Sequence, residues 1–203
     1  MASTTTSLEA LTSLLRDAES VIAPYVRDSD EEPTLGALAA SGPRAVEAPD
    51  EYILLVEAIR EGYLLHYETP RLIDGADGDL RLLAGDYLYA LGLERLAARG
   101  DLDAVRELAD LISLAAQVHA ENGDGQTAET VGALWLAATV AVGAGTTPRH
   151  KRAKEAVRQS RPDAAAQLLR SAVETSRRKG MSDALALAAD SIGFAAEDLS
   201  NSG

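Results

Sequence analysis

The chain has 203 residues and a formal net charge of −13, and its 38 alanines and 29 leucines make up a third of it. Alanine and leucine favour helices and only eight residues are aromatic, so the composition argues against an all-β or α/β fold. The acidic balance argues against nucleic-acid binding, because like charges repel a phosphate backbone. The absence of cysteine excludes disulfides, thiol catalysis and thiolate metal ligands.

Hydrophobic spacing and helix-stop residues predict about seven helices and no strand. The expected helices cover residues 7–23, 50–67, 80–98, 102–120, 127–143, 163–179 and 182–199. The helix at 127–143 is apolar nearly all round, so we expect it at the centre of the protein rather than across a membrane. Residues 149–161 are basic. Helices of this length joined by short breaks predict an all-α bundle.

The N-terminal part, residues 1–48, is predicted to be one helix followed by an acidic linker. Residues 28–49 contain three prolines, two glycines and five acids, with a short helical turn at residues 35–40. Residues 49–203 are predicted to form the helical domain. The first twenty residues lack the basic and apolar regions of a signal peptide, so we expect a soluble, cytoplasmic protein.

Candidate metal ligands are few. The three histidines, His66, His119 and His150, lie outside the motifs that pair histidine with glutamate on a metal-binding helix. Two of them lie on apolar faces of predicted helices, where a buried, hydrogen-bonded histidine is the favoured interpretation. The loop at residues 71–79 holds three aspartates and is interpreted as a solvated acidic loop, with a weak Mg²⁺ site as the alternative.

One segment is more specific. Residues 82–101, LLAGDYLYALGLERLAARGD, resemble the stretch that follows the first aspartate-rich motif of trans-polyprenyl diphosphate synthases, with Gly85-Asp86-Tyr87-Leu88 as the best-matching motif. Upstream, the family has a helix ending in His-Asp-Asp-x-x-Asp, whereas residues 65–70 read LHYETP. His66 and Glu68 therefore mark a degenerate motif. In such a motif, clustered carboxylates hold the Mg²⁺ ions that bind the substrate diphosphate.

Further departures from the family pattern lie downstream. Gln126-Thr127 stands where the family has Lys-Thr, and a second Asp-Asp-x-x-Asp is absent. The chain is also shorter than such enzymes, so the resemblance predicts a truncated isoprenoid-synthase-like bundle. A synthase-like body without these carboxylates resembles the small, non-catalytic subunit (component I) of heterodimeric heptaprenyl diphosphate synthases, which serve menaquinone biosynthesis.

The resemblance implies a role in support of a catalytic large subunit, whose activity and product chain length depend on the small one. Mg²⁺ is expected on that partner, and this chain is expected to hold no metal, cofactor or catalytic residue of its own. The implied interface or chain-tunnel residues are Gly85, Asp86, Tyr87, Tyr89, Gly132, Ala133 and Ala137. The small residues among them would leave room for an isoprenoid chain. Whether the chain forms a homodimer when alone is left open.

Two alternatives remain. The chain can be a stand-alone helical binding or scaffold protein on a degenerate prenyl-synthase fold. It can also be an enzyme of different chemistry that uses His66, Glu68, Asp74 or Asp77.

Overall fold

The computed structural model describes residues 7–17, 20–121, 124–195 and 199, and within these ranges it contains helices and no β-strand, which confirms the all-α class. Nine α-helices and one 3-10 helix, η1 (Ala23–Tyr25), lie in these ranges. The α-helices are α1 (Ser7–Asp17), α2 (Thr34–Ala40), α3 (Pro49–Tyr67), α4 (Gly78–Ala98), α5 (Leu102–Glu121), α6 (Asp124–Ala144), α7 (Pro148–Arg158), α8 (Ala164–Lys179) and α9 (Ser182–Ser191).

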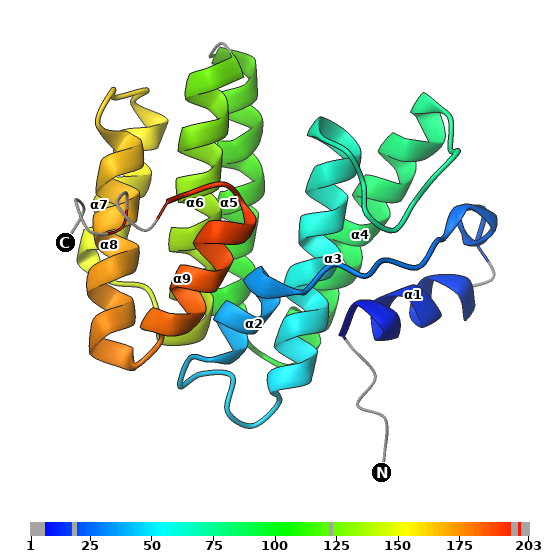
Figure 1. Cartoon of the computed structure of the whole chain (residues 1–203), viewed down its shortest axis with the longest axis horizontal. Helices are drawn as coiled ribbons and strands as arrows, with labels where there is room; N and C mark the ends of the chain where they lie inside the picture. The colour runs from blue at the N-terminus through cyan, green and yellow to red at the C-terminus, as the bar shows by residue number, and fades with distance from the viewer. Residues whose placement is uncertain (1–6, 18–19, 122–123, 196–198, 200–203) are drawn as a thin grey trace.

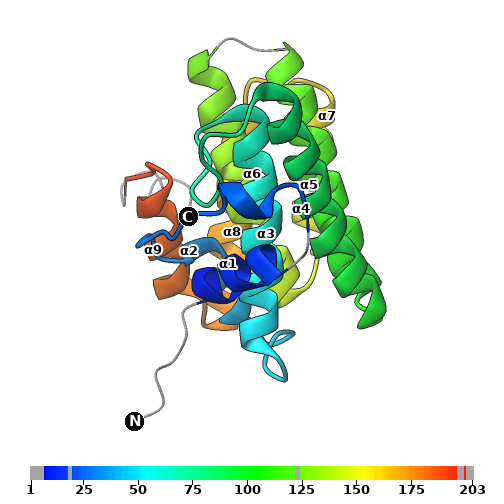
Figure 2. The same ribbon diagram turned by 90° about the vertical axis from the view of Figure 1, so that its right-hand side faces the viewer.

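The helices form a bundle around the pair α5 and α6. In Figure 1 this pair stands between α7 and α8 on one side and α3 and α4 on the other. Helix α2 packs against α3 and α6, and α9 packs against α2 and α8. Helix α1 lies across α3, as Figure 2 shows from the side.

Two apolar clusters hold the bundle together. The larger one contains buried residues from each of the helices α2 to α9, with Trp135 of α6 as its largest fully buried side chain. The smaller one joins Leu8, Leu11 and Leu15 of α1 to the outer faces of α3 and α4. Burial of such side chains is the main favourable contribution to folding, so the smaller cluster ties α1 to α3 and α4.

Helix α6 has the central position that its apolar composition predicts. Its segment Gln126–Ala144 is long and apolar enough to cross a membrane, with a mean hydropathy of 1.3, and it is the one such segment among the described residues. Other helices bury 78% of it. A core helix passes the same test of length and composition, so the hydropathy is weak evidence for a membrane span.

The count of about seven helices is too low for the described residues. Helix α2 occupies the segment interpreted as a linker with one helical turn, and its Leu35, Leu38 and Ala39 are buried in the larger cluster. Helix α7 occupies the basic segment, where Thr147 accepts a hydrogen bond from the His150 backbone N–H and caps the first turn. Both helices are short and become stable through tertiary packing.

Two predicted helix ends are also wrong. The first helix ends at Asp17 instead of residue 23, and the chain turns at residues 20–22 so that Ile22 reaches the same cluster as Leu8. Residues 18–19 lie outside the described ranges. The last helix ends at Ser191 instead of residue 199, because Gly193 adopts a left-handed conformation, with φ of 88°, that favours glycine.

Candidate functional site

A cavity of about 600 Å³ opens between α3, α5, α6 and the end of α9, and we call it the aromatic cavity. Helix α3 contributes Arg60, Tyr63 and Tyr67, which share one face because they are three and four residues apart. Helix α6 contributes Trp135 and helix α5 contributes His119. The volume lies within the usual range for small-molecule sites.

The aromatic side chains of this cavity contact one another directly. The rings of Tyr67 and His119 stack with centroids 4.1 Å apart and planes 4° apart. The Tyr63 ring meets the Trp135 ring edge-on at 5.6 Å. Offset-stacked and edge-to-face arrangements are the favoured geometries for such rings, so the wall of the cavity is built from mutually supporting contacts.

Glu68 belongs to the same wall. The Tyr63 hydroxyl donates to Glu68 Oε1 over 2.7 Å and lies 3.0 Å from His119 Nε2. Because Tyr63 has one phenolic proton, His119 Nε2–H donates in the second contact. Burial raises the pKa of Tyr63 and lowers the pKa of His119, so both side chains are neutral at pH 7.

Arg60 of this cavity has an ion-pair partner but no hydrogen-bond acceptor among the described residues. Its side chain is 13% exposed, and its guanidinium lies 4.9 Å from the Tyr63 ring and 5.1 Å from the Trp135 ring. The nearest carboxylate oxygen, Glu68 Oε2, is 3.7 Å away, which is too far for a hydrogen bond, and none to Arg60 is found within the described ranges. Burial lowers the pKa of Arg60. The cavity therefore contains a cation without a hydrogen-bond acceptor.

The two residues of the degenerate motif lie on opposite sides of the end of α3. Glu68 lines the aromatic cavity, whereas His66 faces α4, where its ring stacks on Tyr89 at 5.3 Å. His66 Nε2 lies 3.2 Å from Asp86 Oδ1 but is not hydrogen-bonded to it. The contacts of His66 with Tyr89 and Asp86 join α3 to α4. Glu68 takes no part in them.

Gly85 lies at a close approach of α3 and α4. A Cβ placed on Gly85 would lie 2.6 Å from the His66 ring and 3.2 Å from the Gly62 carbonyl oxygen, and one on Gly62 would lie 2.9 Å from the Tyr89 ring. The absence of both side chains lets the two helices pack in contact. Tyr89 is therefore part of the α3–α4 packing, and Gly85 permits it.

Tyr87 lies on the exposed side of α4. Leu82, Leu83 and Tyr87 are 50%, 55% and 37% exposed and lie together on the outer surface of α4, which we call the α4 face. Asp86 is exposed beside them. The other large hydrophobic side chains exposed within the described ranges are single residues on other segments, apart from Tyr67 in the aromatic cavity.

The predicted tunnel residues of α6 have different environments. Gly132 lines the aromatic cavity, and a Cβ placed on it would lie 2.6 Å from the Phe194 ring. Ala133 and Ala137 are buried in the larger apolar cluster. Only Gly132 of the three therefore borders open space, and the tunnel role of the alanines stays a prediction.

The acidic loop before α4 forms local contacts. Asp77 Oδ1 accepts a hydrogen bond from the Leu80 backbone N–H and caps α4, and Asp74 accepts one from the Gly75 N–H and pairs with Arg27 at 3.5 Å. In the part of the chain that the structure describes, no group of three or more His, Cys, Asp or Glu side chains has the arrangement of a metal site.

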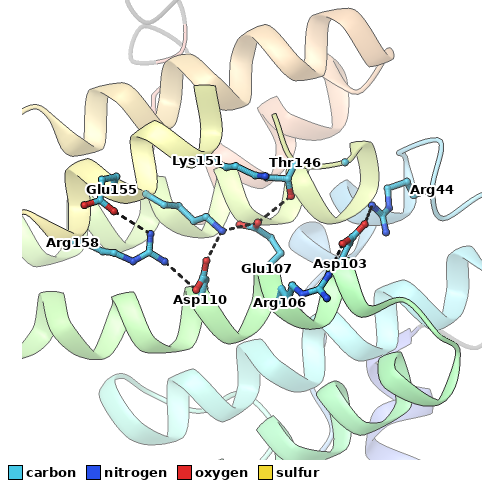
Figure 3. Close-up of a pocket in the computed structure, with 11 residues that line it drawn as sticks. Arg44, Asp103, Arg106, Glu107, Asp110, Thr146, Lys151, Glu155 and Arg158 are labelled. Carbon is cyan, nitrogen blue, oxygen red and sulfur yellow. Dashed lines mark hydrogen bonds and ion pairs between the residues drawn. The ribbon is translucent and has the colours of Figure 1, made fainter. Parts of the chain in front are cut away.

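A second cavity, of about 690 Å³, is lined by charged residues of α5 and α7 and by Arg44, and we call it the polar cavity. Figure 3 shows Glu107 and Asp110 on α5 facing Arg158 and Glu155 on α7. Glu107 is buried, and its carboxylate accepts hydrogen bonds from His150 Nε2 at 2.5 Å and from Lys154 Nζ at 2.8 Å. Unlike Arg60, these groups are hydrogen-bonded to one another.

The hydrogen bonds of Glu107 with His150 and Lys154, which we call the polar network, make the free energy of unfolding depend on pH in the acidic range. Burial alone would raise the pKa of Glu107, but hydrogen bonds and charge from His150 and Lys154 outweigh it and lower that pKa below its ordinary 4.5. Its contribution is thus complete above about pH 4.5 and is lost as the pH falls through the folded-state value. We expect urea-unfolding curves to show this loss, and Glu107→Gln to flatten it. An unchanged acid dependence in the variant would contradict this assignment.

Sequence reasoning missed Arg60, Trp135 and the polar network. Arg60 lies three residues before Tyr63 on a helix, and His150 and Lys154 are four residues apart, so the spacing was present in the sequence. Their partners, Glu107 and Trp135, are distant in the chain. Only the packing of the helices brings them together.

Comparison of the chain with known protein families, with curated proteins and with solved structures found no match. The described residues form an all-α bundle that contains the aromatic cavity and the polar cavity.

Proposed function

We propose that this chain is a non-catalytic accessory subunit of a heterodimeric long-chain trans-polyprenyl diphosphate synthase. The observation that carries the proposal is the α4 face, where Leu82, Leu83 and Tyr87 of the synthase-like segment are exposed within six residues of one helix. Apolar side chains grouped on a surface are typical of protein interfaces. The family it resembles dimerises through helices near the same segment, so the α4 face is the proposed docking surface.

The state of the degenerate motif supports a non-catalytic role. Its one carboxylate, Glu68, accepts a hydrogen bond from Tyr63 and lies near Arg60, and His66 is packed against Tyr89. A Mg²⁺ site that binds a diphosphate needs several free carboxylate oxygens. In this proposal the catalytic partner holds Mg²⁺, the complex is cytoplasmic, and it serves isoprenoid and menaquinone biosynthesis with an isoprenoid chain near the interface.

The test is co-expression with a catalytic large subunit encoded in the same genome. We expect the purified chain to be inactive alone and to raise long-chain prenyl transfer by that partner. Leu83→Glu with Tyr87→Glu should weaken the complex at least about tenfold, because each buried apolar side chain contributes about 1.5–3 kcal/mol. Affinity is measured by calorimetry and folding by circular dichroism.

The matched control is Leu187→Glu on α9, an exposed leucine away from the α4 face, which should leave binding unchanged. Prenyl transfer by the chain alone would overturn the non-catalytic role. Equal binding by the double α4 variant and by wild type would overturn the docking surface.

A stand-alone helical binding protein is the second candidate, and the aromatic cavity favours it. A cavity that holds a mostly buried guanidinium with no hydrogen-bond acceptor among the described residues is an arrangement suited to a ligand, and it needs no partner subunit. This function predicts ligand binding by the isolated chain, as a monomer or homodimer, and no change in synthase rate on mixing.

A further inference from the structure

We propose that the aromatic cavity binds a small organic monoanion, a carboxylate carried on a flat ring system, with Arg60 at the carboxylate and the Tyr67–His119 pair against the ring. The inference holds for either function above, because all of the residues involved belong to this chain. It assigns a ligand site within the bundle, separate from the α4 face.

The first step concerns Arg60. A guanidinium has five N–H donors. Those of Arg60 are absent from the buried unpartnered atoms of the described residues, so they face the open space of the cavity, where a ligand can reach them. Around Arg60 the described structure offers two aromatic rings and one carboxylate at 3.7 Å. In the polar cavity, by contrast, Lys154 donates to Glu107 and Asp110 at 2.8 and 2.7 Å. The unused donors of Arg60 therefore identify the aromatic cavity as the one prepared for an acceptor from outside.

The second step concerns the charge of the ligand. Among the described residues that line the aromatic cavity, Arg60 is the one arginine or lysine, and Glu68 lines it as well. A smaller neighbouring cavity of about 220 Å³ shares Arg60 and is lined by Glu31, Glu32 and Glu57, and by Arg71, which is already hydrogen-bonded to Glu57. A diphosphate would carry several negative charges towards these acids, with Arg60 as the guanidinium that is not already hydrogen-bonded to a carboxylate of the described residues, whereas a single carboxylate matches the fork of Arg60. The surroundings thus select a monoanion.

The third step concerns the shape of the ligand. The walls are the stacked Tyr67 and His119 rings, the Tyr63 ring and the apolar side chains of Val131 and Ile192. Aromatic faces bind other flat rings by offset stacking. Tyr67 is partly exposed, so one face of the pair stays accessible to a ligand. A flat, conjugated body fits these walls better than a flexible chain.

The experiment is calorimetric titration of the isolated full-length chain with 2-naphthoate. We expect saturable binding by wild type and none, or far weaker binding, with the neutral analogue 2-naphthalenemethanol. Arg60→Gln should weaken binding about 10- to 100-fold, the range for loss of a charge-assisted hydrogen bond. The single tryptophan, Trp135, lies in the cavity wall, so a change of its fluorescence on addition of benzoate locates the site.

Two further variants keep the test decisive. Tyr67→Ala removes a partly exposed ring, is expected to fold, and should weaken 2-naphthoate binding, which covers the case in which Arg60→Gln fails to fold. Arg158→Gln in the polar cavity is the matched control and should bind like wild type.

Absence of 2-naphthoate binding at millimolar concentration, equal binding of the neutral analogue, or full binding by both cavity variants would overturn the proposal. Displacement of 2-naphthoate by inorganic diphosphate at lower concentration would overturn the monoanion assignment. No synthase subunit is present, so failure here is distinct from failure of the accessory role.

Discussion

Replacement of Arg71 by Met is expected to lower the free energy of unfolding by about 3–5 kcal/mol, the cost of leaving buried charges without a partner. Arg71 donates from NH1 to Glu57 Oε2 at 2.8 Å and from Nε to Glu61 Oε2 at 3.2 Å. Both glutamates are fully buried. Burial opposes the charge of Arg71, but the two carboxylates outweigh it and raise its pKa.

The same network holds the loop before α4 in place. Glu61 Oε1 accepts from the backbone N–H groups of Arg71 and Leu72, and Glu57 Oε1 accepts from the Gly36 N–H. Helix α2, helix α3 and the loop therefore share one charged centre. Loss of Arg71 alone leaves two carboxylates in a place from which water is excluded, and this is why the expected effect is large.

Urea unfolding at pH 7 measures the Arg71 effect. Arg178→Met, which removes an exposed arginine paired with Glu174 on α8, is the control and should change stability by less than about 0.5 kcal/mol. The triple variant Glu57→Gln, Glu61→Gln, Arg71→Met should recover much of the loss, because Gln keeps an acceptor oxygen without the charge. If the Arg71→Met variant were as stable as the Arg178→Met variant, the role of Arg71 as the partner of the two buried glutamates would be contradicted.

Replacement of Lys154 by Met is expected to lower the free energy of unfolding by about 3 kcal/mol, at the low end of the range for a broken buried pair. Lys154 Nζ lies between Glu107 Oε2 and Asp110 Oδ2, and both Lys154 and Glu107 are buried. The effect is smaller than for Arg71 because Glu107 keeps His150, and Asp110 keeps Arg158 at 3.1 Å.

A double-mutant cycle tests this assignment. Glu107→Gln removes the buried charge, so Lys154→Met should cost less in that background, and the difference measures the coupling between the two side chains. Equal costs in both backgrounds would show that Lys154 acts through packing of its hydrocarbon stem.

The bodies of the helices could be predicted from the sequence, and their ends and number only partly. The segment at residues 102–121 shows why: its apolar spacing is strong and Arg99-Gly100-Asp101 marks its start. Helix α2 has only seven residues, follows Pro33 and contains Gly36. Its stability comes from the burial of Leu35 and Leu38 in the core. Such a helix depends on contacts that the local sequence does not specify.

The residues of the candidate sites could also be predicted only in part from the sequence. The sequence singled out Glu68 and Gly132, which the fold brings to one cavity, and Tyr87, which it leaves on the surface. It did not single out Arg60, because an arginine on a helix is ordinary until its surroundings are known. The missing acceptor becomes evident only once Tyr63 and Trp135 are seen to occupy the space around it.

By itself, the sequence of this protein determined an all-α class and a central apolar helix, because helix propensity and hydrophobic spacing are local properties. It also showed that the aspartates of the resembling motif are absent. Only the tertiary structure decided which charges are buried and whether they are paired, because Glu107 meets His150, and Arg60 lacks an acceptor, through helix packing across long stretches of chain. The energy of a buried charge depends on its neighbours in space, and these are set by the fold.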